Sequence, residues 1–125
     1  MDRILIALIA YAAACLVHHA HNAHFLDAYP NMPAWLSPAG VYFAWLLASA
    51  VGAAGYVLLR SGHRALGMAA LLAYAVYGID ALAHYLVAPL SAHSLAMNAT
   101  IWLEAGMALV LLWTVFSSRS ARSSH

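Results

Sequence analysis

The chain contains no lysine, and only four of its 125 residues are acidic. Charged residues make up 7% of the sequence, whereas a soluble domain carries about a quarter. A chain with so few charged residues cannot form the charged surface of an ordinary soluble domain. The missing basic face also excludes nucleic acid as a partner, because no cluster of cations is available to neutralise phosphates.

Cysteine and proline are scarce as well. The single cysteine, Cys15, cannot form an internal disulfide, and inside an apolar run a thiol ordinarily packs as a small hydrophobic side chain. The four prolines all fall between the long apolar runs, at Pro30, Pro33, Pro38 and Pro89. The runs themselves are therefore free of helix-breaking residues.

Hydrophobic residues account for 66% of the chain, and the mean hydropathy is +0.81. Four stretches, residues 4–25, 41–59, 65–87 and 95–116, approach the roughly 20 apolar residues that cross a bilayer. The connections are short, so neighbouring helices should be antiparallel. We predict an all-α polytopic membrane protein: residues 1–116 form one four-helix transmembrane domain of up-down topology, and residues 117–125 form a disordered cytoplasmic tail. The first stretch is too long for a signal peptide and lacks a small-residue cleavage site, so we interpret it as a retained span.

The arginines predict the orientation of the chain. They lie before the first stretch, between the second and third, and in the tail, at Arg3, Arg60, Arg64, Arg119 and Arg122. By the positive-inside rule both termini and the middle connection are cytoplasmic, and the other two connections face outward. The expected location is the cell (inner) membrane.

Polar residues gather toward the outward-facing end. The segment "VHHAHNAHFLDAYP", residues 17–30, holds four histidines and Asp27. Asp80 and Glu104 lie inside the third and fourth stretches, where insertion scales put the cost of a charged residue at about 2.5–3.5 kcal/mol. Such residues usually face a partner, a cavity or a pathway, so the sequence predicts an outward-facing polar site.

Helical spacing suggests which side chains meet at this site. In a continuous α-helix Asp80 and His84 share a face, and Tyr77 joins them. On the first helix we expect His21 and His24 to point inward and His19 to sit at the level of the lipid headgroups. The remaining expectations are an interfacial His18, a solvated His93 and a hydrogen bond from Thr100 to Glu104.

The first functional hypothesis is a transition-metal site for zinc, copper or iron. Imidazole nitrogens and carboxylate oxygens are ligands for these ions, and the residues that supply them are His21, His24, Asp80, His84 and Glu104. Such a protein would handle a metal or serve as a small subunit of a membrane metalloenzyme.

A second hypothesis follows from an internal similarity. The segment "AHFLDA" at residues 23–28 matches "AHYLVA" at residues 83–88, sixty positions later. A duplication and a coincidence in an alanine-rich chain both remain open. A real duplication would give a 2+2 parallel repeat in which His24 and His84 face one another, as axial ligands of a b-type haem beside Tyr77.

The third hypothesis is a small membrane enzyme or proton-coupled transporter acting on a lipophilic substrate. Glu104, Asp80 and His84 would then serve as acid–base groups. The lipid bilayer is the expected partner, together with a larger membrane complex or a second copy of the chain. Small residues on the second stretch, at Ala44, Ala48, Gly52 and Gly55, allow helices to approach closely.

Overall fold

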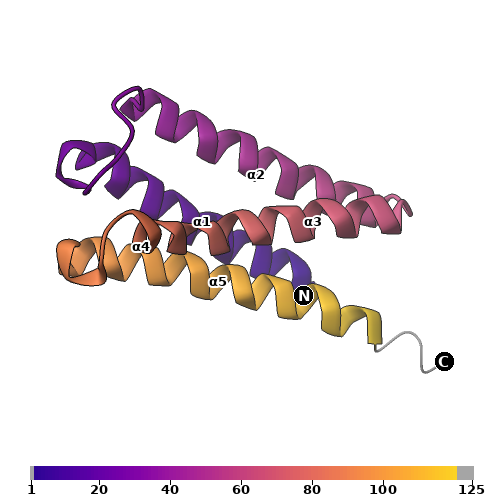
Figure 1. The fold of residues 1–125 in the computed structure, drawn as a ribbon. Coiled ribbons are helices and arrows are strands. Elements are labelled where there is room, and N and C mark those ends of the chain that lie inside the picture. The colour runs from indigo at the N-terminus through magenta and orange to yellow at the C-terminus, as the bar shows by residue number, and fades with distance from the viewer. Residues whose placement is uncertain (1, 121–125) are drawn as a thin grey trace.

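The computed structural model describes residues 2–120, and over this range the protein is entirely helical, without strands. Its four long helices are α1 (Arg3–His24), α2 (Pro38–Arg60), α3 (Arg64–Ile79) and α5 (Leu95–Ser120) (Figure 1). Short elements lie in the connections: η1 (Leu26–Ala28), η2 (Asp80–Ala83), α4 (His84–Val87) and η3 (Leu90–Ala92). Helix α5 continues past the predicted end of the fourth stretch to Ser120, and the rest of the predicted tail, residues 121–125, lies outside the described residues.

Four helical segments are long and apolar enough to cross a membrane. They are Arg3–His24, Pro38–Arg60, Arg64–Val87 and Leu95–Ser118. The predicted all-helical class and the four candidate spans are therefore confirmed. Large apolar side chains such as Phe43, Leu47 and Trp113 are exposed along them, as expected for helices whose outer surface contacts lipid rather than water.

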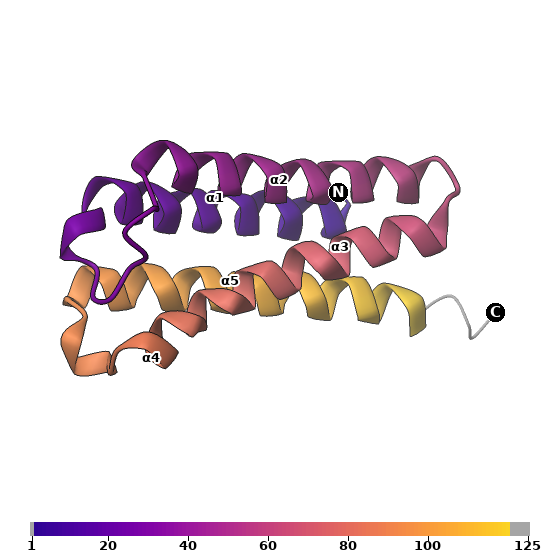
Figure 2. The ribbon, with the colours of Figure 1, turned by 45° about the horizontal axis from the view of Figure 1, so that its top comes forward.

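The long helices form a ring of neighbours. Helix α1 packs against α2, α2 against α3, α3 against α5, and α5 back against α1. Each long helix runs opposite to the one before it, and the N-terminus lies toward the same end as the C-terminus (Figures 1 and 2). We call this end, with the turn at residues 61–63, the terminal end. The opposite end, with the connections at residues 25–37 and 88–94, is the two-loop end.

The helices begin where the sequence supplies capping groups. Asp2 caps α1 and accepts hydrogen bonds from the amides of Ile4 and Leu5, at 3.0 and 3.4 Å. The hydroxyl of Ser37 caps α2 by accepting from the Gly40 amide at 3.1 Å, and proline occupies the first position of that helix. These groups satisfy amides that lack partners within the helix. Gly62, with a φ of 90°, makes the tight turn between α2 and α3.

The third span is not one continuous α-helix, contrary to the spacing argument. Helix α3 ends at Ile79, a 3₁₀ segment follows over Asp80–Ala83, and one α-helical turn completes the span. In 3₁₀ geometry, with 3.0 residues per turn, residues four apart are separated by roughly 120° instead of 40°. Asp80 and His84 are therefore not related by α-helical spacing, although both side chains line the same cavity.

Glycines set the spacing of the helices at the terminal end. A Cβ placed on Gly67 of α3 would lie 2.5 Å from the amide nitrogen of Leu59 and 2.7 Å from the carbonyl oxygen of Gly55, both on α2. Gly52 likewise leaves room for the ring of Tyr74. The small residues of α2 are thus used against α3 in the same chain. Toward the two-loop end α2 and α3 separate (Figure 1).

Two tyrosines close the core between the two ends. The rings of Tyr11 and Tyr74 are 4.5 Å apart, and the Tyr11 hydroxyl donates to the carbonyl oxygen of Tyr74 at 2.9 Å. Ser49 lies 3.2 Å from the Tyr74 hydroxyl. This layer ties α1, α2 and α3 together directly below the polar site.

Candidate functional site

The buried face of α1 carries Cys15, His18, His19 and Asn22 into the interior. These residues continue the phase of Ile4, Leu8 and Tyr11, which are also buried, because positions three and four apart lie on one helix face. His21 is half-buried, its Nδ1 lies 2.9 Å from the Tyr29 hydroxyl, and His24 is exposed. The expected orientation is therefore corrected: His18 and His19 point inward, and His24 points out.

Glu104 of α5 is the carboxylate at the centre of the site. It is 1% exposed, and its Oε2 has no hydrogen-bond partner. The nearest basic atoms are His18 Nε2 at 3.8 Å and His19 Nδ1 at 3.9 Å. Both distances exceed those of hydrogen bonds, so a buried acceptor is left without a donor.

The hydrogen bonds of His19 fix its tautomer. Its Nδ1 lies 2.8 Å from the carbonyl oxygen of Cys15, which can only accept, so Nδ1 carries the proton. The Tyr77 hydroxyl then donates to Nε2 at 2.7 Å. His19 is held as a neutral imidazole by two partners, and Tyr77 belongs to the site as its sequence position suggested, although it acts on His19.

His18 is oriented by Thr100. The threonine hydroxyl donates to the carbonyl oxygen of Met97 at 3.0 Å, so its oxygen accepts from His18 Nδ1 at 3.2 Å. This assignment leaves the lone pair of His18 Nε2 free on the side that faces Glu104. The expected bond between Thr100 and Glu104 is replaced by this contact with His18.

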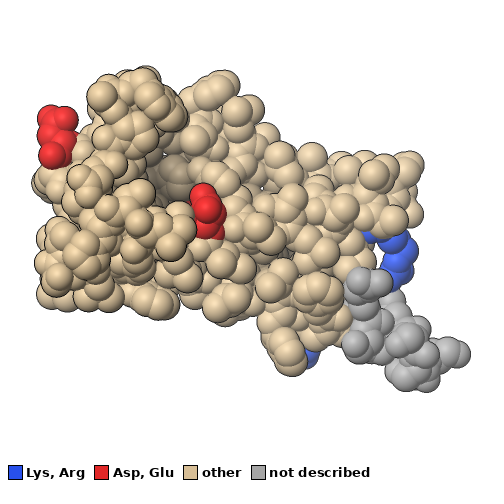
Figure 3. Space-filling model, in the orientation of Figure 1, with Lys and Arg blue, Asp and Glu red and all other residues tan. Residues whose placement is uncertain are grey.

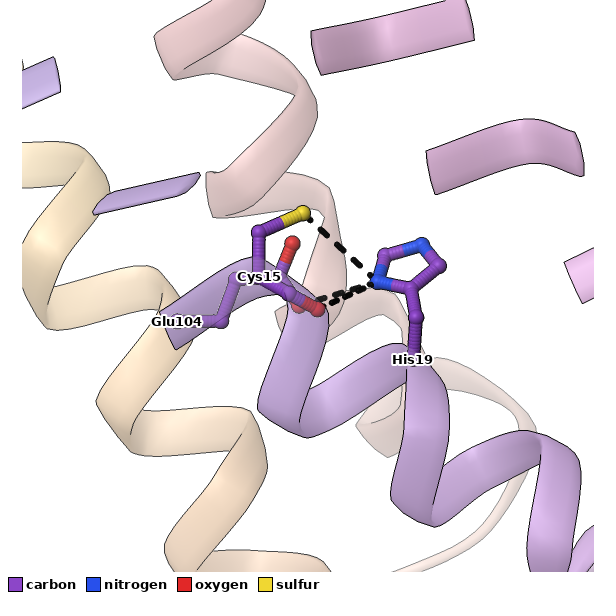
Figure 4. Close-up of side chains that lie close together, drawn as sticks. All are labelled: Cys15, His19 and Glu104. Carbon is purple, nitrogen blue, oxygen red and sulfur yellow. Dashed lines mark hydrogen bonds and ion pairs between the residues drawn. The ribbon is translucent and has the colours of Figure 1, made fainter. Parts of the chain in front are cut away.

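Cys15, His19 and Glu104 form a compact group of donor atoms (Figure 4). One ligand atom from each residue lies within 4.8 Å of the other two, and Cys15 Sγ is 3.6 Å from His19 Nδ1. Ligands held about 2.0–2.3 Å from one tetrahedral ion lie roughly 3.3–3.6 Å apart. The group therefore has nearly the spacing of donors around a single metal ion, and it could hold one.

Further histidines extend this group toward the two-loop end. The His84 ring lies 5.3 Å from that of His18 and 6.0 Å from that of His93. His93 is buried rather than solvated. Its Nδ1 donates to the carbonyl oxygen of Pro89 at 3.0 Å, and its Nε2 has no partner. Burial raises the pKa of the neighbouring Tyr29 hydroxyl, which stays neutral near pH 7.

A cavity of about 280 Å³ opens beside Glu104 between α1, α2 and the third span. Its polar walls include His18, His19, Asn22 and Tyr77, and Asp80 is exposed at its edge. Figure 3 shows one acidic side chain beside a hollow, a second at the two-loop end, and basic side chains only toward the terminal end.

The structure brings together part of the predicted site. Glu104 is its centre, Tyr77 and His84 lie beside it, and Asp80 lies at the mouth of the cavity. His21 and His24 lie apart from Glu104, and His84 contacts His18 and Tyr29 rather than His24. The sequence argument missed a set of inward-facing residues: Cys15, His18, His19, Asn22 and His93.

Comparisons of the chain with protein-family models, with curated proteins and with solved structures give no match. The fold and the site define the class on their own: an all-helical chain with four helices able to span a membrane and a buried Cys–His–Glu group able to hold a metal ion.

Proposed function

We propose that this protein is an integral membrane protein that binds a divalent transition-metal ion at Cys15, His19 and Glu104. The observation that carries the proposal is the spacing of these three buried donors, too long for hydrogen bonds between Glu104 and the histidines and close to that of ligands on one ion. Thiolate, imidazole and carboxylate suit zinc, copper or iron.

Charge balance favours a divalent ion. A thiolate from Cys15 and a carboxylate from Glu104 contribute two negative charges, and the neutral His19 contributes none. A divalent cation makes the centre neutral overall, which removes the large cost of burying uncompensated charge in a region of low dielectric constant.

Tyr77 accommodates the tautomer of His19 that would bind a metal. The neutral ring carries a single proton, so for Nδ1 to bind an ion that proton would have to move from Nδ1, where it faces the Cys15 carbonyl, to Nε2. The Tyr77 oxygen, 2.7 Å away, then accepts from Nε2 where its hydroxyl donated before. A polar partner of this kind on the second nitrogen is a regular feature of metal-bound histidine.

The proposal takes its fourth donor from His18. Its Nε2 is free and lies 3.8 Å from Glu104 Oε2, but it is outside the group of donor atoms within 4.8 Å of one another, so the His18 ring would have to shift toward Cys15 and His19 to bind the same ion. Four protein ligands close a tetrahedral site, whereas catalytic zinc sites keep one position open for water. The arrangement favours holding and handling a metal over activating water on it.

The expected topology and orientation complete the proposal. The up-down bundle lies in the inner membrane with both termini cytoplasmic and the two-loop end outward, supported by Arg60 and Arg64 at the terminal end. The 2+2 repeat remains a proposal, and its support is the similarity of residues 23–28 to residues 83–88. The lipid bilayer is the partner, and association with a larger complex or a second copy stays a proposal.

Metal binding is tested on detergent-purified protein stripped with chelator and reloaded with Co²⁺. We expect one ion per chain, with a thiolate-to-cobalt absorption band that Cys15→Ser removes. Glu104→Gln, which keeps the side-chain shape, should weaken binding at least tenfold. His24→Ala, at an exposed position, is the matched control and should bind like the parent.

Two results would overturn this assignment. A parent protein that takes up no cobalt, zinc, copper or iron after stripping excludes the metal centre. Binding that survives Cys15→Ser and Glu104→Gln but disappears in His24→Ala moves the site to the histidines at the end of α1.

The unpartnered Glu104 Oε2 supports a second candidate, acid–base chemistry on a lipophilic substrate or proton-coupled transport. A buried carboxyl beside neutral imidazoles can exchange a proton with them. In a metal-free parent, this candidate predicts that Glu104→Gln abolishes proton uptake coupled to substrate, while Cys15→Ser leaves it intact.

A further inference from the structure

A second group of polar atoms lies at the mouth of the cavity, nearer the surface than the Cys15–His19–Glu104 group. It comprises the carboxylate of Asp80, the imidazole of His84 and the side-chain amide of Asn22. Asp80 is exposed, His84 is half-buried, and Asn22 is only 6% exposed. The three residues come from α1, η2 and α4, so tertiary packing assembles them.

Asn22 provides independent evidence for a ligand at the mouth of the cavity. Its Oδ1 is buried and has no hydrogen-bond partner, while its Nδ2 lies 3.5 Å from His84 Nε2. Leaving a buried amide oxygen unpaired costs about 1–3 kcal/mol. An unpartnered group of this kind in a native protein calls for an explanation such as a ligand that fills the gap.

The atoms left free in the cavity are all acceptors. They are Asn22 Oδ1, Glu104 Oε2 and the lone pair of His18 Nε2, with the Asp80 carboxylate at the mouth. No arginine lines the cavity, and the chain has no lysine. A lining of acceptors without fixed positive charge selects a cation.

The mouth is connected to the two-loop end. A second hollow of about 200 Å³ shares Met32, Asp80 and His84 with the cavity and extends to Val87, the last residue of α4. Met32 also lines a third hollow, among the residues of the first connection. Adjacent hollows that share lining residues therefore lie between the two-loop end and Glu104.

We infer that Asp80, His84 and Asn22 form an entry site, which captures the divalent transition-metal ion before it passes to Cys15, His19 and Glu104. The inference rests on the proposed metal centre and adds the route by which the ion reaches it. Oxygen and imidazole donors bind these ions with less affinity than a set that includes a thiolate. The ion therefore passes from weaker, more exposed ligands to stronger, buried ones.

The test measures the rate of loading separately from final occupancy. Stripped full-length protein in detergent is mixed with Co²⁺, and the thiolate-to-cobalt band is followed in a stopped-flow spectrometer. We expect Asp80→Asn to load about tenfold more slowly and to reach one ion per chain at saturation. His84→Gln, which changes no fixed charge, should slow loading as well.

Asp2→Asn is the charge-matched control because Asp2 lies at the terminal end and lines neither the cavity nor the hollows beside it. It should load at the rate of the parent. If Asp80→Asn and His84→Gln load as fast as the parent and fill to the same level, the entry site is excluded while the metal centre stands. A parent that takes up no Co²⁺ overturns both.

Discussion

The two ends of the helix ring differ in whether their buried and half-buried polar groups have hydrogen-bond partners. At the terminal end Asp2 accepts from two backbone amides and from the Tyr56 hydroxyl at 2.9 Å, and Arg60 lies 3.6 Å away. In the half nearer the two-loop end, the buried side-chain atoms without partners are Asn22 Oδ1, Trp45 Nε1, His93 Nε2 and Glu104 Oε2. Polar groups with hydrogen-bond partners stabilise the fold, whereas a buried group without one calls for a water, an ion or a ligand.

The distance between α2 and α3 also differs between the two ends: it is short near the terminal end and longer toward the two-loop end (Figure 1). Backbone contact through Gly55 and Gly67 closes α2 against α3 near the terminal end. Toward the other end the helices diverge around a cavity lined by Val41, Ala44 and the histidines of α1. Close packing at one end thus supports an open, polar space at the other.

We expect the largest effect from a substitution that forces α2 and α3 apart at the terminal end. In Gly67→Ala the new methyl meets backbone atoms of Leu59 and Gly55, which cannot rotate away. We expect a loss of about 1–3 kcal/mol in the free energy of unfolding, typical of overpacking. Reversible denaturation in detergent, followed by circular dichroism, measures this loss.

Gly106→Ala is the control for helix propensity, since a Cβ there meets nothing within 4 Å. Its unfolding free energy should stay at or slightly above that of the parent. Equal stabilities of the Gly67 and Gly106 variants would show that backbone contact between α2 and α3 does not stabilise the terminal end.

A smaller effect, on metal affinity, is expected from Tyr77→Phe in the half nearer the two-loop end. The substitution removes the hydroxyl that lies 2.7 Å from His19 Nε2, leaving the metal-bound form of His19 without an acceptor. Loss of such a partner typically lowers metal affinity by about tenfold or more. Competition with a chelator of known affinity gives the change in Kd.

Tyr85→Phe is the matched control. Its hydroxyl donates to Asn98 Oδ1 at 2.7 Å, at the same end of the bundle but away from Glu104. The metal affinity of Tyr85→Phe should equal that of the parent. An equal weakening in both variants would point to a general loosening of the two-loop end instead of a specific role for Tyr77.

The smallest effect concerns the charge of Asp2. Partial burial opposes that charge, but hydrogen bonds from Tyr56 and the Leu5 and Ile4 amides, with Arg60 nearby, lower the pKa of Asp2 below its usual value of 3.8. Because the folded pKa lies below the unfolded one, the stabilisation is present above about pH 4 and is lost as pH falls through the folded pKa.

Asp2→Asn keeps an oxygen able to cap α1 and removes only the charge. At pH 7 we expect a loss of less than about 1 kcal/mol in the free energy of unfolding. Once the pH falls below the folded pKa of Asp2, parent and variant should converge. A difference between them that persists unchanged at low pH would show that the charge contributes nothing and that shape alone matters.

The sequence was sufficient for the class of fold and for the centre of the site. Four apolar runs free of proline predict four helices, and the structure has them. Glu104, a carboxylate deep within such a run, indicates a buried polar site, and it lies at the centre of the donor group. Both inferences rest on the high cost of charge and of unpaired backbone in an apolar environment.

The inward face of α1 was within reach of the sequence but could not be read from periodicity. That helix is apolar all round before Val17, so hydrophobic spacing does not distinguish its buried side. Extending the phase of Tyr11 and Cys15 by three, four and seven residues beyond Cys15 would have selected His18, His19 and Asn22 in place of His24. Only a contact that fixes the phase, such as Tyr11 against Tyr74, decides between them.

What the sequence determined by itself is therefore the class of fold, four helices long and apolar enough to span a membrane, and one residue of the site, the buried Glu104. The tertiary structure decided which histidines belong to it, through the phase of α1 against α5 and the change to 3₁₀ geometry at Asp80. It also brought Cys15 beside Glu104, 89 positions later in the chain. Spacing along one helix constrains neighbours on that helix, whereas the meeting of donors from different helices depends on how those helices rotate and pack.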